Sequence, residues 1–406
     1  MTDTALAIPT KILPYAGKIM DVDTHEQSPI NTWNDLYGSI VDPLIEALKV
    51  MKLPAILDVR EKDDTEINAQ TVWKTKLFNA PGAFDFGRRI EVMDLTGVKQ
   101  QIIFPGNLGL FAVWAYAVAG IPEMFSALPG SATERRSYAR KLIASHNEWA
   151  MRVTRSSNRY VVVGALIGET PDELLAEAKR LLKHGIRGIW MPSSIPPAGV
   201  SPAHSLLDPL WDALSAADVP VLAHIGADRD FLRTEVWNDA PAFEGFRVGA
   251  EVPLDPWTLA TMNRATENFL ATLVMGGVFE RHPKLRYGAM ETGGNWIGPL
   301  AQHLDIWIRQ TGLFVGPNAK RPELKMKPSE YIRRNVRVAP FGFEDVGDYI
   351  ARYGMPELYC YGSDFPHLEG GVDPMGKAVE SFERHGISED IMKMYFVDNA
   401  KLLVPN

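Results

Sequence analysis

The chain has 406 residues, of which 46% are hydrophobic and 23% are charged, and its formal net charge is -8. This composition is typical of a soluble globular protein, and an acidic balance without a basic cluster argues against nucleic acid and anionic membranes as partners. No apolar run approaches the ~20 residues that a membrane-spanning helix needs, and we expect no secretory signal in residues 1–10. The single cysteine, Cys360, excludes an internal disulfide, so we expect a cytoplasmic protein.

Strand-like and helix-like segments alternate along the chain, which predicts an α/β fold with a parallel sheet. Several strand-like segments are continuous apolar runs, as expected where both faces of a strand are buried. Eight such segments alternate with helices, and this pattern predicts a (β/α)8 barrel of the TIM type. In chain order, the expected strands are 18–23, 101–105, 160–167, 187–191, 219–224, 285–291, 335–339 and 358–361.

The segments between the strands carry apolar residues at helical spacing. One of them opens with Ser131-Ala132-Thr133-Glu134, which predicts a capping box at the start of a long helix. Another has a Pro in its first turn, at Pro171, and a Gly just after its end, at Gly185. The expected helices are 88–96, 131–152, 170–184, 209–217, 257–279, 295–310, 343–352 and 375–384.

Two long stretches, 29–86 and 228–256, exceed what a bare barrel needs. Long connections of this kind in compact domains are usually functional loops or lids. We therefore expect both to form a lid or an interface within a single barrel domain that spans residues 1–406.

Acidic and histidine side chains follow the ends of several predicted strands. Alternate residues of a strand share a face, so Asp21, Asp23 and His25 are expected to point together into the barrel mouth. The carboxyl ends of the strands form the active site in barrels of this type. The fifth, sixth and eighth strands add further donors at the same rim. The candidate metal ligands are Asp23, His25, His224, Glu291, Asp364 and His367.

Carboxylate and imidazole donors in this number favour one or two divalent ions, with Zn, Fe or Mn as the candidates. Taken alone, Asp364 has a structural interpretation as a helix cap, but the coincidence at four strand ends favours a site. Asp364 and His224 are the candidate catalytic residues. Arg187 is a candidate for holding a substrate carboxylate, with a salt bridge in the barrel wall as the alternative. The apolar part of the pocket is expected to be lined by Trp190, Trp296 and Phe365, for which core packing is the alternative.

These motifs resemble those of the amidohydrolase superfamily, in the branch that contains aminocarboxymuconate-semialdehyde decarboxylase and gamma-resorcylate decarboxylase. The resemblance extends over most of the chain and rests on the order of the motifs at 20–25, 93–98, 208–211, 281–285, 362–367 and 399–403. It implies a barrel that binds one or two divalent metals. It also implies that His25, His224 and Asp364 are ligands, and that Asp364 serves as a general base or proton shuttle.

Two positions depart from the pattern of that branch. Asp23 stands where a His or Glu is usual, and Glu291 stands where a His is frequent. Both positions therefore offer oxygen, and harder, more anionic sites favour Fe or Mn over Zn.

We expect metal-assisted decarboxylation or hydrolysis of a small carboxylated or carbonyl-bearing substrate, and the resemblance favours decarboxylation. A second hypothesis is a dinuclear Fe or Fe/Mn site that activates dioxygen for hydroxylation. A third hypothesis is a non-catalytic accessory subunit of a heteromeric complex. We expect a small-molecule substrate and a homo-oligomer, with a hetero-oligomer as the alternative.

Overall fold

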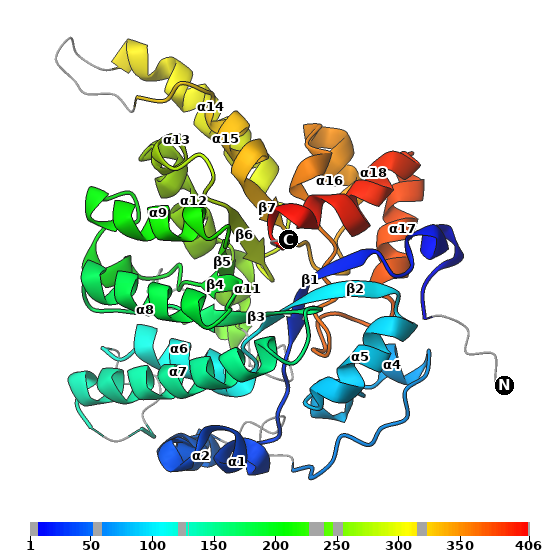
Figure 1. Ribbon diagram of the computed structural model, residues 1–406. Coiled ribbons are helices and arrows are strands. Elements are labelled where there is room, and N and C mark those ends of the chain that lie inside the picture. Colours follow the sequence, from blue (N-terminus) through cyan, green and yellow to red (C-terminus); the bar gives the residue numbers. More distant parts are fainter. Residues whose placement is uncertain are drawn as a thin grey trace.

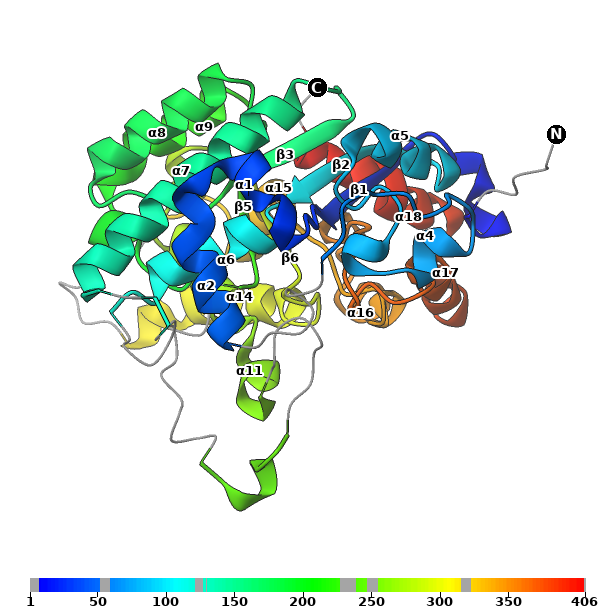
Figure 2. The same ribbon diagram turned by 90° about the horizontal axis from the view of Figure 1, so that it is seen from below.

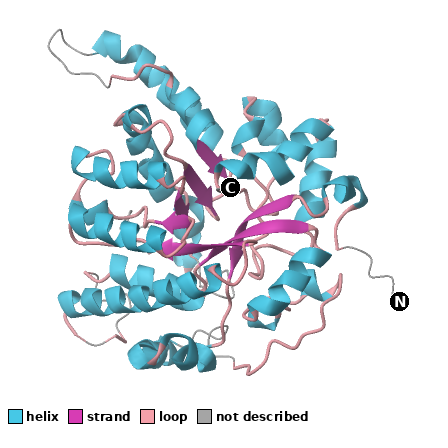
Figure 3. Cartoon of the chain, viewed as in Figure 1, coloured by secondary structure: helices cyan, strands magenta, loops and turns pink. Residues whose placement is uncertain are grey.

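The strands lie at the centre of the molecule and the helices surround them (Figures 1 and 3). The computed structural model describes residues 7–51, 59–120, 127–128, 130–226, 239–246, 255–314 and 323–404. The strands pair in parallel, in the order β1-β2-β3-β4-β5-β6-β7. They are β1 (Ile19–His25), β2 (Val98–Phe104), β3 (Tyr160–Ala165), β4 (Gly188–Trp190), β5 (Val221–His224), β6 (Tyr287–Met290) and β7 (Val336–Val338).

The eighth predicted strand closes this sheet into a barrel, although it does not form a regular strand. Its backbone lies between β7 and β1, with one hydrogen bond to each neighbour in the same short stretch. The N–H of Cys360 donates to the carbonyl oxygen of Val338 in β7 (2.9 Å), and the N–H of Val22 in β1 donates to that of Tyr361 (3.0 Å). The prediction of a TIM-type barrel is confirmed, with this segment in the eighth position.

The irregularity of this segment has a local cause. Leu358 ends a short 3-10 turn and Asp364 has a left-handed backbone with φ of 53°, so a regular ladder is interrupted on both sides. Pairing with β1 resumes only as an isolated bridge between Phe365 and Thr24. Gly362 lies between them at the tightest point of the closure. A Cβ at this position would lie 2.7 Å from the Cβ of Asp23 and 3.1 Å from that of Ala339. Glycine is therefore required where β1 and the end of β7 approach the segment.

The predicted helices are present around the barrel. The capping box is confirmed, because the N–H of Glu134 donates to Ser131 Oγ (3.3 Å) and the N–H of Ser131 donates to Glu134 Oε2 (2.8 Å). The helices that follow the first insertion are α5 (Phe86–Leu95), α6 (Asn107–Ala117), α7 (Ala132–Thr154), α8 (Pro171–Lys183), α9 (Asp208–Ala216), α11 (Pro256–Thr261), α12 (Arg264–Met275), α13 (Val278–Arg281), α14 (Ile297–Phe314), α15 (Pro328–Asn335), α16 (Val346–Tyr353), α17 (Pro374–Arg384) and α18 (Glu389–Lys393).

Two helical segments differ from expectation. The single helix predicted at 257–279 is divided into α11, α12 and the start of α13. The second break falls at Gly276-Gly277, where Gly277 adopts a left-handed backbone with φ of 69°. Helix α6 was not predicted, because its side chains are apolar on all sides and so lack amphipathic spacing. Most of α6 is buried, as expected for a helix that is hydrophobic all round.

The first insertion forms the short helices α1 (Trp33–Tyr37), α2 (Asp42–Met51) and α4 (Thr71–Lys74). Figure 2 shows α1 and α2 lying across α7. Helix α7 anchors this part of the insertion through Tyr138, which donates to the carbonyl of Ile40 (2.7 Å), and Ser145, which donates to that of Tyr37 (2.8 Å). The predicted lid or interface at 228–256 lies largely outside the described residues. Among the helices that the structure describes, none is long and apolar enough to cross a membrane.

Replacing Gly362 with Ala should destabilise the protein by about 1–3 kcal/mol, because the new methyl group overlaps the wall formed by Asp23 and Ala339. Denaturant unfolding monitored by circular dichroism measures this change. The matched control is Gly120→Ala, where the added Cβ meets no atom within 4 Å. Equal stability of the two variants would contradict the close packing at position 362.

Candidate metal centre

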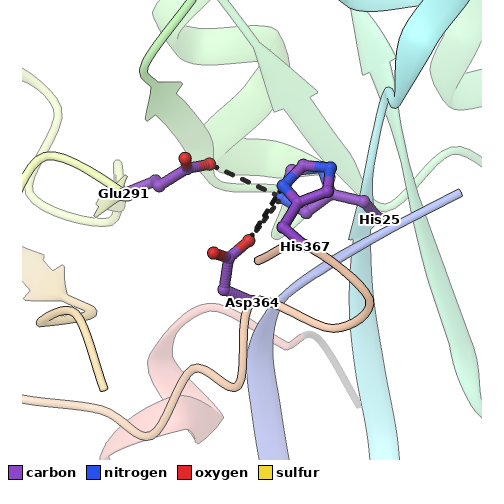
Figure 4. Close-up of side chains that lie close together, drawn as sticks. All are labelled: His25, Glu291, Asp364 and His367. Atoms are coloured by element: carbon purple, nitrogen blue, oxygen red, sulfur yellow. Dashed lines mark ion pairs between the residues drawn. The ribbon is translucent and has the colours of Figure 1, made fainter. Parts of the chain in front are cut away.

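The barrel mouth brings all six predicted ligands together. Two overlapping groups of potential ligand atoms form there, each with all its atoms within 4.8 Å of one another. One group is His25, Glu291, Asp364 and His367, shown in Figure 4, and the other is Asp23, His25 and His224. Figure 4 shows the carboxylates of Glu291 and Asp364 turned towards the histidine rings.

His25 lies at the centre of this cluster. Its Nε2 is 3.4 Å from Asp364 Oδ1, 3.6 Å from Asp23 Oδ1 and 3.7 Å from Glu291 Oε2. His224 Nε2 lies 3.3 Å from the same nitrogen and 3.0 Å from Glu291 Oε2. These separations leave room for a cation between the donor atoms.

The second nitrogen of each central histidine fixes the orientation of its ring. His25 Nδ1 faces the carbonyl oxygen of Pro105 (3.4 Å), and His224 Nδ1 faces that of Ile225 (2.8 Å). A carbonyl oxygen only accepts hydrogen bonds, so Nδ1 carries a proton, and Nε2 is the nitrogen that faces the cluster, where it can bind a metal once it is deprotonated. This arrangement is the usual outer support of a metal-binding imidazole. The ring of Phe104 packs on His224, with centroids 4.6 Å apart.

The carboxylate oxygens of the cluster fit a divalent cation. Asp23 Oδ1, Glu291 Oε2 and both Asp364 oxygens are buried and accept no hydrogen bond of good geometry from the described residues. Buried polar atoms are nearly always hydrogen-bonded, and burying an ionised carboxylate without a partner costs folding free energy. Several such oxygens converging with two imidazole Nε2 atoms form a donor set of the kind that binds Mn, Fe or Zn.

The ionisation of the cluster points to the same conclusion. Burial alone would raise the pKa of the Asp23 carboxyl, but the imidazoles of His224 and His25 outweigh burial and hold it at about 2. Burial, with added repulsion from Asp364, raises the pKa of Glu291 to about 7. Burial likewise raises the pKa of Asp364 to about 7. Three crowded carboxyl groups repel one another, and a divalent cation relieves that repulsion.

Two of these acids have an unusual backbone conformation. Glu291 and Asp364 are left-handed, with φ of 51° and 53°, a region that side chains other than glycine rarely occupy. The conformation at Asp364 is held from both sides, since its N–H donates to the carbonyl of Asp23 (2.8 Å) and its own carbonyl accepts from the N–H of His367 (2.8 Å). Strain of this kind gathers at functional sites, where the surrounding structure enforces it.

Asp21 does not join the cluster, contrary to the expectation that it shares the direction of Asp23 and His25. Its carboxylate accepts hydrogen bonds from the N–H (2.9 Å) and Oγ (2.6 Å) of Ser363. The register of β1 is irregular between Asp21 and Thr24, which changes the simple alternation of side chains. Asp21 therefore holds the turn that carries Asp364.

Arg89 is a supporting residue that the sequence did not indicate. It is fully buried, donates to the carbonyl oxygen of His25 (2.7 Å), and lies 4.7 Å above the ring of Phe365. Burial lowers the pKa of its guanidinium to about 10. Arg89 stands next to Arg88 in the sequence, and two adjacent arginines look like surface residues. The sequence therefore gives no signal that Arg89 is buried.

The four predicted substrate-binding residues do not all lie at the barrel mouth. Arg187 precedes β4, at the amino end of the barrel, and donates to the carbonyls of Asn158 (3.1 Å) and Tyr160 (2.8 Å). The expectation for Arg187 is thereby corrected, because a residue before the strand lies at the end opposite the cluster. Trp190 ends β4, and its ring lies 6.1 Å from that of His224.

The other two aromatic candidates are buried near the strand ends. Trp296 donates its indole N–H to the carbonyl of Gly293 (2.8 Å), two residues after Glu291. Phe365 packs on Arg89 and accepts at its carbonyl from the N–H of His25 (2.7 Å). Both residues support the turns that carry the acids, and their contact with a substrate stays a prediction.

Removing bound metal with a chelator should lower the melting temperature, because the repulsion among the buried carboxylates returns. Adding Mn²⁺ at a hundredfold excess over its Kd should restore about 2.7 kcal/mol of stability. Thermal unfolding with and without Mn²⁺ measures the effect. The control is His224→Ala, which lacks one central nitrogen and should respond much less; an equal response would place the ion elsewhere.

The comparisons with known proteins agree with this geometry. Residues 122–405 match the model of the family described as amidohydrolase. The matched segment contains His224, Glu291, Asp364 and His367, whereas β1 with Asp23 and His25 precedes it. A search of curated proteins finds no significant match.

Solved structures with the same fold include an amidohydrolase from Mycobacterium avium subsp. paratuberculosis K-10, with a TM-score of 0.66 and 19% identity over 96% of this chain and 99% of that chain. Another is 5-carboxyvanillate decarboxylase from Sphingomonas paucimobilis, with a TM-score of 0.58 and 17% identity over 95% and 98% of the two chains. A third is dihydroxybenzoic acid decarboxylase from Polaromonas sp. JS666 with bound manganese and the inhibitor 2-nitroresorcinol, with a TM-score of 0.55 and 17% identity over 95% and 96%.

These structures share the barrel fold over nearly their whole length, and the family match covers more than half of this chain. The predicted resemblance is therefore confirmed, and so is the expectation of an enzyme of the hydrolase or decarboxylase kind. The protein belongs to the amidohydrolase family.

Proposed function

We propose that this protein is a Mn²⁺-dependent decarboxylase that acts on a small hydroxylated aromatic acid. The observation that carries the proposal is the convergence of two imidazole Nε2 atoms with buried carboxylate oxygens that accept no hydrogen bond of good geometry from the described residues. Oxygen-rich sites favour manganese over zinc. The reaction class is supported by similar structures that are decarboxylases of 5-carboxyvanillate and dihydroxybenzoic acid, one of them with bound manganese.

The donor set favours one ion rather than two. Both groups of potential ligands depend on the same atom, His25 Nε2. One imidazole nitrogen has one lone pair and binds one ion, while His25 Nδ1 is directed at the carbonyl of Pro105. Two complete sites cannot share that atom, which argues against the dinuclear oxygen-activating hypothesis.

A divalent ion in this cluster would polarise a substrate oxygen and neutralise its charge. His25, His224, Asp23 and Glu291 would hold the ion, and Asp364 would contribute one oxygen while its other oxygen carries a proton. Asp364 gives that proton to the ring carbon that bears the carboxylate. The bond from this carbon to the carboxylate then breaks, and its electron pair returns to the ring as carbon dioxide leaves. The substrate anion and one proton thus yield the phenol and CO2.

We also propose a cytoplasmic homo-oligomer. Ile306 and Trp307 support an association surface, since they are 49% and 48% exposed on α14, a helix that projects from the barrel in Figure 1. Sedimentation analysis of the purified chain should show a dimer or larger species. A monomer at micromolar concentration would contradict this proposal, and co-purification with a different chain would favour the hetero-oligomer.

The purified Mn²⁺-loaded protein should release carbon dioxide from 2,6-dihydroxybenzoate or 5-carboxyvanillate. Asp364→Asn should lower kcat by about 10²–10⁴-fold, the range that general acid catalysis contributes. Metal content is measured in parallel, so that loss of the ion is distinguished from loss of the proton donor. Asp35→Asn makes the same chemical change on the exposed face of α1 and should leave kcat unchanged.

Three results would contradict the proposed reaction. Hydrolysis of esters or lactones without carbon dioxide release would favour the hydrolase. Two iron ions per chain with substrate-dependent oxygen uptake would favour the oxygenase. Full activity of metal-loaded Asp364→Asn would remove Asp364 from the proton transfer.

A further inference from the structure

Trp190 is the last residue of β4, at the barrel mouth and beside the metal centre. Its side chain is buried, with 1% exposure. Its ring meets that of His224 nearly edge-on, with centroids 6.1 Å apart and an interplanar angle of 76°. Backbone pairing places Trp190 opposite Leu222, two residues before His224 in β5. The indole therefore lies against the histidine that faces the cluster.

The indole N–H of Trp190 has no hydrogen-bond acceptor among the described residues. Four other buried tryptophans of this chain donate their N–H to backbone carbonyl oxygens. These pairs are Trp33 with Ser28 (3.0 Å), Trp73 with Ala7 (2.9 Å), Trp211 with Pro202 (3.1 Å) and Trp296 with Gly293 (2.8 Å). Trp190 departs from this pattern at the position that borders the metal centre.

An indole N–H is a donor only, and it carries no charge. Leaving it unpaired in a buried place costs free energy, so a core tryptophan without an acceptor needs an explanation. A ligand that supplies an acceptor to this donor would remove the cost. The best acceptor is an anionic oxygen, because hydrogen bonds to ionised groups are the strong ones.

We propose that the Trp190 N–H is the donor that binds the substrate carboxylate; this inference rests on the proposed decarboxylase function. The carboxylate would lie between the ion held by His25 and His224 on one side and the indole on the other. Trp190 is then a specificity-determining residue, since it selects a ring that bears an acceptor at this position.

The proposal has a kinetic consequence. The carboxylate is anionic in the bound substrate and becomes neutral carbon dioxide as the bond breaks. A hydrogen bond to it is therefore stronger in the ground state than in the transition state, and it contributes to binding rather than to the chemical step. Losing the donor should therefore raise both KM and kcat, so that kcat/KM falls by less than KM rises.

The test compares Trp190→Phe with Trp211→Phe in the Mn²⁺-loaded protein. Both changes remove an indole N–H and reduce a buried ring, but the N–H of Trp211 is already satisfied by Pro202. We measure KM and kcat for 2,6-dihydroxybenzoate, the inhibition constant of resorcinol, which lacks the carboxylate, and the affinity for Mn²⁺.

Trp190→Phe should raise KM for 2,6-dihydroxybenzoate by about 10–100-fold, the effect of removing a hydrogen bond to a charged group. Resorcinol inhibition and Mn²⁺ affinity should change by less than about threefold. Trp211→Phe should leave KM, resorcinol inhibition and Mn²⁺ affinity near the values of the wild type.

Three results would overturn the inference. An unchanged KM in Trp190→Phe would show that the N–H makes no bond to the carboxylate. Equal weakening of 2,6-dihydroxybenzoate, resorcinol and Mn²⁺ would make Trp190 a packing support for His224. Failure of the wild-type protein to bind or convert 2,6-dihydroxybenzoate, with 5-carboxyvanillate also inert, would contradict the proposed function and this inference with it.

Discussion

The closure of the barrel between β7 and β1 is the constraint on which the site depends. Backbone hydrogen bonds from Val22 to Tyr361 and from Asp364 to Asp23 join the two ends of the chain. These bonds place one acid of the eighth segment beside one acid of the first strand. Gly362 permits this approach because it has no side chain. Without the closure, the candidate ligands His224 and Glu291 would lie apart from Asp364 and His367.

The electrostatics of the site follow from this packing. Buried acids that are pressed together raise one another's proton affinity, and the imidazoles of His25 and His224 compensate only part of the charge. The outer residues make the arrangement rigid. Ser363 is tied to Asp21, and the guanidinium of Arg89 is tied to the carbonyl of His25. The left-handed backbones at Glu291 and Asp364 persist because these contacts leave no alternative.

Apolar runs followed by acids and histidines are visible in the sequence, so the strands and the clustering of the six candidate ligands could be predicted. The same pattern failed where a side chain's direction depends on a distant partner. Asp21 turns away from the cluster to a serine 342 positions later, which strand alternation cannot reveal. Arg187 was expected to contact the substrate at the carboxyl ends of the strands, but β4 begins after it, so it lies at the amino end of the barrel. Helix α6 lacked a periodic signal, since it is buried on every side.

Residue chemistry and strand order already determine that acids and histidines from β1, β5, β6 and the eighth segment gather at one rim, because parallel strands share their carboxyl end. The three-dimensional packing decides which of them lie around a single central nitrogen. It also decides which carboxylate oxygens find no hydrogen-bond partner among the described residues, and that the indole N–H of Trp190 finds none there either. Those facts depend on distances of a few ångströms between segments far apart in the chain. They are the facts on which the proposals of a single ion and of a role for Trp190 rest.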